Sequence, residues 1–163
     1  MARRNTTSTL ALTLALALAC SSATKTTPPT LQLVDGTGGS LITGSIQQSG
    51  SAVQTTTGID VVFTVKNVGA ADTTFALSPC FPQARVYTAA TGGSLAYPTN
   101  GGRVCTMMAI LVKLAPGESR SRLLTLNADT VASQLSPRRY YLRLGPIYAA
   151  GTTELPAGVV DRP

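Results

Sequence analysis

The stretch Ile59-Asp60-Val61-Val62-Phe63-Thr64-Val65-Lys66 is the clearest indication of structure in this chain. Every second residue in it is apolar, and most of these apolar residues are β-branched. The alternation predicts a half-buried β-strand. We expect the strand to end at Asn67-Val68-Gly69, because these residues form a turn signal. The side chains that would share the buried face are Ile59, Val61, Phe63 and Val65.

Short apolar runs separated by Gly, Pro, Asn and Thr continue on both sides of this strand. The run 106–114 (TMMAILVKL) is long and largely apolar, as expected of a central strand. A turn is predicted at Ala115-Pro116-Gly117-Glu118, where Pro presets a negative φ and Gly permits a positive one. The best helical candidate is 127–135. The other expected strands are 73–77, 85–88, 94–97, 119–126 and 139–144, with weaker edge candidates at 31–34, 41–47, 155–158 and 159–160.

This succession of short strands predicts an all-β fold. We expect an immunoglobulin-like two-sheet antiparallel β-sandwich, with a small barrel as the competing architecture. The chain of 163 residues has the length of one domain, which we place at residues 31–163. The Gly-rich stretch 35–39 is interpreted as a turn and not as a phosphate-binding loop, since no Lys and no helix start follow it.

Residues 1–19 have the composition of a secretory signal peptide. Arg3 and Arg4 precede an apolar run at 10–19 (LALTLALALA), and small residues follow. This run is too short to cross a bilayer, which takes roughly 20 apolar residues. A cleaved signal peptide of this kind places the mature domain outside the cytoplasm.

The end of this segment, Leu16-Ala17-Leu18-Ala19-Cys20, resembles the bacterial lipobox, although Ala17 stands where Leu is commonest. The resemblance implies a covalent diacylglycerol on Cys20 and a polar tether over residues 20–30. Because Ser21 is not Asp, it also implies a periplasm-facing lipoprotein of the bacterial cell envelope, anchored in the outer membrane. The alternative is ordinary cleavage after Ala17-Leu18-Ala19, which would leave Cys20 as a plain thiol.

The chain has three cysteines, and an odd number in an exported protein needs an explanation. Lipidation uses Cys20 and leaves Cys80 and Cys105. In an oxidising compartment these two are expected to form a disulfide. Two free thiols remain an alternative, and a metal site is disfavoured because two thiolates without His or a Cys-x-x-Cys spacing rarely make one.

The composition argues against several functional classes. The chain has 13 Lys and Arg, 7 Asp and Glu, and no His, for a formal net charge of +6. Without His and with few carboxylates, it is poorly equipped for general acid–base catalysis or for a metal centre. We therefore expect no enzyme, no metal and no cofactor apart from the lipid. Nucleic-acid binding is not expected, since no basic stripe with interleaved aromatic residues occurs.

A cluster of arginines lies in the second half of the sequence. If the strands 119–126 and 139–144 pair, these side chains share one face of a sheet. Such a face would contact an anionic partner or lipid headgroups; the alternative is a solvated sheet face. The arginines are Arg120, Arg122, Arg138, Arg139 and Arg143.

Three stretches resemble the BsuPI-type domain, a family named for an intracellular bacterial proteinase inhibitor. They are 61–69 (VVFTVKNVG), 113–119 (KLAPGES) and 135–144 (LSPRRYYLRL). The resemblance spans roughly residues 58–145 and implies an immunoglobulin-like fold. The chain departs from the family at Arg138, where Gly is usual, and it lacks the family's common Trp.

These observations predict a non-catalytic, lipid-anchored protein of the cell envelope. It would act as a binding module or as an accessory subunit, with another envelope protein as its partner. The alternative function is proteinase inhibition of the BsuPI type, which rests on the resemblance alone and assigns no inhibitory residue.

Overall fold

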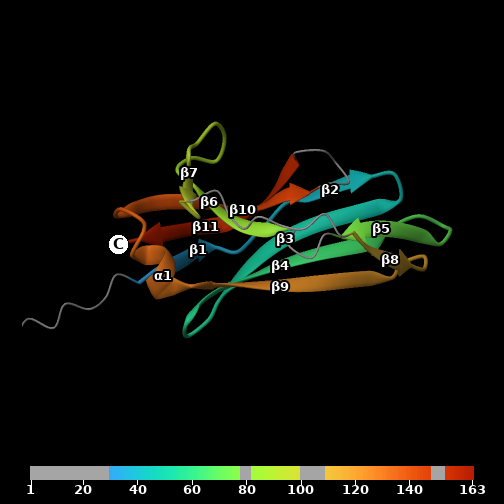
Figure 1. The fold of residues 1–163 in the computed structure, drawn as a ribbon, viewed down its shortest axis with the longest axis horizontal. Coiled ribbons are helices and arrows are strands. Elements are labelled where there is room, and N and C mark those ends of the chain that lie inside the picture. Colours follow the sequence, from blue (N-terminus) through green and yellow to red (C-terminus); the bar gives the residue numbers. More distant parts are fainter. Residues whose placement is uncertain (1–29, 78–81, 100–108, 148–152) are drawn as a thin grey trace, which may run out of the picture.

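The computed structural model describes residues 30–77, 82–99, 109–147 and 153–163, and in this part of the chain it is an all-β sandwich (Figure 1). The elements are β1 (Gln32–Asp35), β2 (Ser40–Thr43), β3 (Ile46–Gln54), β4 (Gly58–Asn67), β5 (Thr73–Leu77), β6 (Gln83–Tyr87), β7 (Leu95–Tyr97), β8 (Ile110–Leu114), β9 (Ser119–Asn127), α1 (Ala128–Ala132), β10 (Arg138–Ile147) and β11 (Thr153–Arg162).

The strands form two antiparallel sheets that face each other. The five-stranded sheet has the order β1-β11-β10-β6-β7, and the four-stranded sheet has the order β2-β3-β4-β9. A separate pair, β5-β8, lies at one end of the molecule (Figure 1). Strands distant in sequence are neighbours, as in the Greek-key connections of immunoglobulin-like domains. The predicted sandwich is therefore confirmed, and the barrel alternative is wrong.

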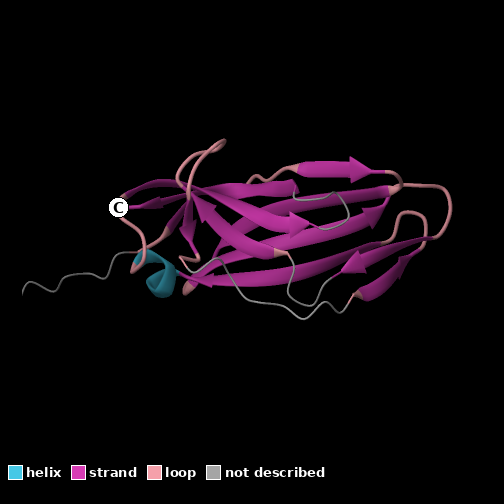
Figure 2. Ribbon diagram, turned by 45° about the horizontal axis from the view of Figure 1, so that its top comes forward, coloured by secondary structure: helices cyan, strands magenta, loops and turns pink. Residues whose placement is uncertain are grey.

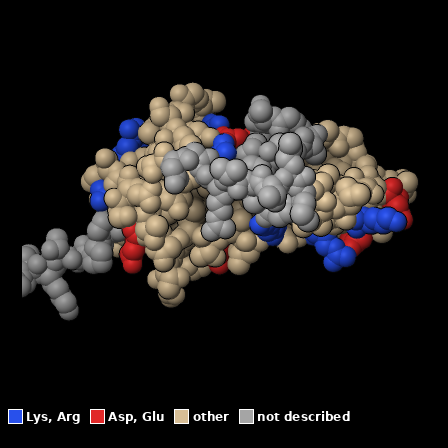
Figure 3. Space-filling model, viewed as in Figure 1, with Lys and Arg blue, Asp and Glu red and all other residues tan. Residues whose placement is uncertain are grey.

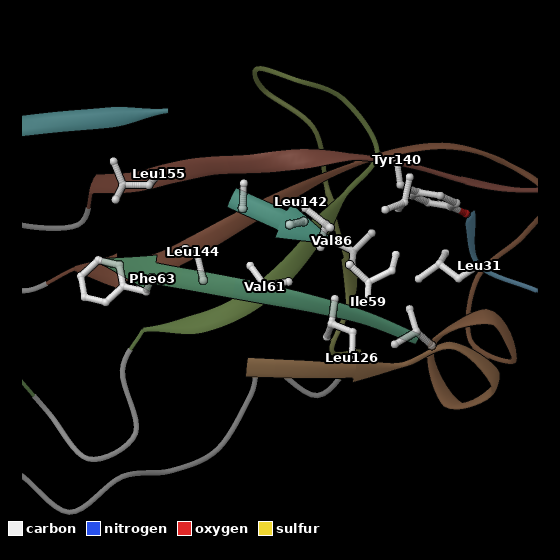
Figure 4. Packing of buried hydrophobic residues seen from close by; sticks show 14 of the residues in the cluster. Leu31, Ile59, Val61, Phe63, Val86, Leu126, Tyr140, Leu142, Leu144 and Leu155 are labelled. Atoms are coloured by element: carbon white, nitrogen blue, oxygen red, sulfur yellow. The ribbon is translucent and has the colours of Figure 1, made fainter. Parts of the chain in front are cut away.

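The core lies between the inner faces of the two sheets (Figure 4). The alternation predicted for β4 is confirmed, because Ile59, Val61 and Phe63 are at most 2% exposed. Leu142 and Leu144 of β10 approach them from the opposite sheet and are equally buried (Figure 4). Burial of this apolar surface is the main force that holds the sheets together.

The Gly-rich stretch between β1 and β2 crosses from one sheet to the other. Gly39 donates its N–H to the Pro156 carbonyl of β11 at 2.9 Å, and its carbonyl accepts the N–H of Gly50 in β3 at 3.0 Å. A Cβ on Gly38 would overlap the carbonyl of Gly50. Glycine is therefore needed here for close backbone approach between the two sheets.

Two expected strands differ from the structure. The run 41–47 is split by a turn at Gly44, whose φ is +60°, and β3 then continues to Gln54. Of the run 106–114, only Ile110–Leu114 forms a strand among the described residues. This strand pairs with β5 in the small sheet, and Leu111 is 70% exposed, so its expected central position is wrong.

The last strand, β11, is longer than the sequence pattern predicts. β11 runs over ten residues and pairs with β1 on one side and β10 on the other, so the expected short edge strands are wrong. Its register with β10 shifts between Gly158 and Pro156. This irregularity interrupts the period-two pattern, which is why the sequence did not reveal a long interior strand.

The segment between β9 and β10 leads from the four-stranded sheet to the five-stranded sheet. It contains α1, which lies at one end of the sandwich (Figure 2). α1 begins after Asn127, whose side chain accepts the N–H of Thr130 at 3.0 Å, and falls within the predicted helix. Tyr140 then enters the core and donates its hydroxyl to the Ser136 carbonyl at 2.8 Å. This is the tyrosine corner of immunoglobulin-like sandwiches.

Replacing Tyr140 by Phe should remove the bond that closes this corner and leave the ring packing intact. Tyr140 is only 3% exposed, and its hydrogen bond to the Ser136 carbonyl is partly buried. We expect the free energy of unfolding to fall by about 1–2 kcal/mol, measured by urea denaturation. No change would show that water replaces the bond at no cost.

Asn67 joins the first two of the family-like stretches. Its side chain is fully buried and donates to the carbonyls of Leu114 and Ala71 at 3.0 and 2.8 Å. Its Oδ1 accepts the N–H of Gly69 at 2.9 Å. Its own N–H is donated to the Glu118 carbonyl at 2.9 Å. Asn67 thus ties the end of β4 to the end of β8 through its side chain and to the β8–β9 turn through its backbone N–H.

Candidate functional site

The five arginines predicted to share a face lie in two different sheets. β9 belongs to the four-stranded sheet and carries Arg120 and Arg122. β10 belongs to the five-stranded sheet and carries Arg138, Arg139 and Arg143. The two strands therefore do not pair, and the expectation that the five arginines share one face is wrong. The cause is the connection through α1, which changes sheets where a hairpin would have kept them paired.

Two of these arginines form exposed ion pairs. Arg120 contacts Glu118 at 2.7 Å, and Arg139 makes hydrogen bonds of 2.9 and 3.1 Å to Asp161. The hydrogen bonds to Arg139 lower the pKa of Asp161, and the same bonds raise the pKa of Arg139. Ion pairs this open to solvent contribute little to stability. On the face seen in Figure 3, charged side chains are scattered among uncharged ones.

A more protected group of charges lies on the outer face of the five-stranded sheet. Glu154 of β11 accepts two bonds on Oε1, from the Tyr87 hydroxyl at 2.6 Å and from Nη1 of Arg85 at 3.1 Å. Its Oε2 lies 3.7 Å from Nη1 of Arg143. The side chains of Glu154, Arg85 and Arg143 are only 13%, 20% and 23% exposed.

The register of the sheet explains why this carboxylate is needed. Arg143 of β10 lies directly opposite Arg85 of β6. Like charges at opposed positions on a sheet repel each other. Glu154 supplies the compensating charge from the third strand. Gly145 leaves room for it, because a Cβ at that position would overlap the Glu154 side chain.

Tyr87 completes the group through its ring and its hydroxyl. The guanidinium of Arg143 lies 5.2 Å from the centroid of the Tyr87 ring, within the range of a cation–π contact. Burial, and next the hydrogen bond to Glu154, raise the pKa of the Tyr87 hydroxyl. Tyr87 therefore remains a protonated donor at neutral pH.

A second aromatic residue extends this surface. Tyr141 lies opposite Tyr87 on one side and Val159 on the other, and it is half-buried. We name this surface the aromatic–arginine face. Its residues are Arg85, Tyr87, Tyr141, Arg143 and Glu154.

Of the five arginines predicted to contact an anionic partner, only Arg143 belongs to this face. Arg85 and Tyr87 alternate with buried Val86, so their common direction was readable from the pattern of β6. Glu154 gave no signal, because it begins a strand whose pattern is interrupted by Pro156 and a bulge.

The predicted lipidation and disulfide residues, Cys20, Cys80 and Cys105, lie outside the described residues.

The disulfide stays a prediction: if the protein is exported to an oxidising compartment, Cys80 and Cys105 should be linked. Peptide mass spectrometry without reduction should find the two cysteine peptides linked, and reduction should separate them. Alkylation of both thiols in the unreduced protein would contradict this prediction.

No group of three or more His, Cys, Asp and Glu side chains in the described ranges could hold a metal ion. In the same ranges, no helix has the length and apolarity to cross a membrane. Comparisons of the chain with protein-family models, with curated proteins and with solved structures find no match.

Proposed function

We propose that this protein is a non-catalytic binding module, anchored by a lipid on Cys20 to the bacterial cell envelope. Its contact surface for another envelope protein would be the aromatic–arginine face. The observation that carries the proposal is the arrangement of this face, in which Tyr87 and two arginines engage one shared carboxylate and Tyr141 lies opposite Tyr87 on the neighbouring strand.

The chemistry of the face suits protein recognition. Tyrosine and arginine are the residue types most enriched at interface hot spots, with tryptophan. Here Glu154 and the sheet register already restrict Arg85, Arg143 and Tyr87. Binding would therefore cost less side-chain entropy than it would for free surface side chains.

The same contacts favour binding over catalysis. Glu154 is the carboxylate of the group, and two guanidiniums and a hydroxyl engage it. General acid–base catalysis needs a titratable group within hydrogen-bond reach of the substrate, and His is the commonest one. The chain also has no His to take that role.

The surface is tested by crosslinking the protein in membranes and purifying it in mild detergent, followed by mass spectrometry. We expect a stoichiometric envelope protein whose crosslinks map to β6, β10 and β11. Tyr141→Ala should weaken its recovery at least about tenfold. Leu123→Ala is the matched control, because Leu123 is 59% exposed and lies on the opposite sheet. Equal loss with both variants, or no partner, would refute the proposal.

The anchor has its own test. Cys20→Ser removes the thiol that accepts the lipid, so the exported protein should move from the membrane to the soluble fraction. Mass spectrometry of the wild-type N-terminal peptide should show the added acyl chains. A variant that stays on membranes as the wild type does would contradict lipidation.

Proteinase inhibition remains the second candidate function. It rests on the sequence resemblance alone; in this chain the three stretches form the end of β4, the β8–β9 turn and the start of β10 with its Tyr140–Ser136 hydrogen bond. Stoichiometric inhibition of a serine protease by the purified protein would establish it. If the protein inhibits no protease of a broad panel, this function is excluded.

A further inference from the structure

A shallow groove of about 500 Å³ lies where β1, β10 and β11 meet. Its lining includes Gln32, Pro137, Arg138, Arg139, Asp161 and Arg162. The lining thus carries three arginines and a single side-chain carboxylate. We name this surface the tether-end groove.

The positive charge of the groove is incompletely compensated. Asp161 neutralises Arg139 through the two hydrogen bonds described above. Arg138 donates one bond to the Thr88 carbonyl at 3.2 Å and contacts the Tyr140 ring, neither of which carries a formal charge. Nε of Arg162 is buried without a hydrogen-bond partner. Among the described residues, the guanidiniums of Arg138 and Arg162 therefore form no ion pair with a side-chain carboxylate.

The groove adjoins the point where the tether joins the domain. Gln32, which lines it, is the first residue of β1, and the described chain begins only two residues earlier. Ten positions separate Cys20 from Thr30, and such a segment spans at most about 35 Å. If Cys20 carries the lipid, this end of the sandwich is the part of the domain held nearest to the bilayer.

We propose that the tether-end groove binds the phosphate groups of anionic lipids in the membrane that holds the anchor. The inference rests on the proposed lipid anchor and adds the surface that faces the bilayer. Arg138 and Arg162 supply the charge, since guanidinium groups bind phosphate through paired N–H donors. This contact would orient the sandwich and leave the aromatic–arginine face open to a partner.

The test uses the full chain with Cys20→Ser, so that none of the binding measurements depends on the attached lipid. Its binding is measured by co-sedimentation with vesicles made of equal parts phosphatidylcholine and phosphatidylglycerol. The groove variant adds Arg138→Gln and Arg162→Gln, which leaves the Arg139–Asp161 pair intact. The matched control adds Lys66→Gln and Lys113→Gln, which remove the same charge from exposed positions on β4 and β8.

Each basic residue near an anionic surface strengthens binding about fivefold, so the groove variant, which lacks two, should bind about 25-fold more weakly than its parent. The control should bind nearly as well as the parent. Binding of the parent should fall in high salt and be absent on pure phosphatidylcholine vesicles. Circular dichroism of both variants checks that they are folded.

Equal binding by the groove variant and the control would overturn the groove while leaving the anchored binding module intact. Displacement from vesicles by inorganic phosphate, but not by sodium chloride at the same ionic strength, would overturn the lipid assignment in favour of a free anion. Wild-type protein recovered without acyl chains and off the membrane would instead overturn the anchor on which the inference rests.

Discussion

Asn67→Ala is expected to lower the free energy of unfolding by about 3–4 kcal/mol. The change removes three hydrogen bonds from a fully buried side chain. It leaves the Leu114 carbonyl without this donor in the interior. Urea denaturation of the purified protein measures the loss.

Asn67→Asp shows whether the lost hydrogen bonds or the lost volume cause the destabilisation. Asn127→Ala is the comparison at an exposed asparagine. Asn67→Asp keeps the shape and the acceptor for Gly69 but places an oxygen against two carbonyls, so at neutral pH it should be at least as unstable as Asn67→Ala. Asn127→Ala removes an exposed helix cap and should cost only about 1 kcal/mol. If Asn67→Asp were close to wild type, the two donated bonds would not matter for stability.

Glu154→Gln should lower the free energy of unfolding by about 2–3 kcal/mol. The amide has nearly the same shape, but it leaves Arg85 and Arg143 opposed on neighbouring strands without a counter-charge. Their side chains are about one-fifth exposed, so water compensates only partly and the cost falls below that of a fully buried pair.

Asp161→Asn is the matched control, because it breaks the ion pair with Arg139, whose side chain is 57% exposed. Its effect should be several-fold smaller. A double-mutant cycle with Arg85→Met isolates the coupling: the double variant should lose less stability than the sum of the single variants. Strict additivity, or equal losses from Glu154→Gln and Asp161→Asn, would contradict a structural role for the cluster.

Several strands and turns could be predicted because their signals are local. The alternation over 59–66, the Asn67-Val68-Gly69 turn and the Pro116-Gly117 turn all appear where expected, and Gly117 has the required positive φ of +79°. β11 could not be predicted in full, since its bulge near Pro156 breaks the period on which the prediction depends.

The candidate site was less predictable than the fold. Arg85 and Glu154 are separated by 69 positions and meet only because β10 lies between their strands. The five arginines close together in sequence are divided between two sheets instead. Nearness along the chain was misleading here, because the α1 connection changes sheets between β9 and β10.

By itself, the sequence determined the all-β class, most strand positions and the expectation of an exported chain, because alternation, turn residues and an apolar leader act over a few residues. Only the tertiary structure determined which strands are neighbours. Strand order follows from burying the inner faces of both sheets together, and this non-local condition brings Arg85, Tyr87, Arg143 and Glu154 into contact.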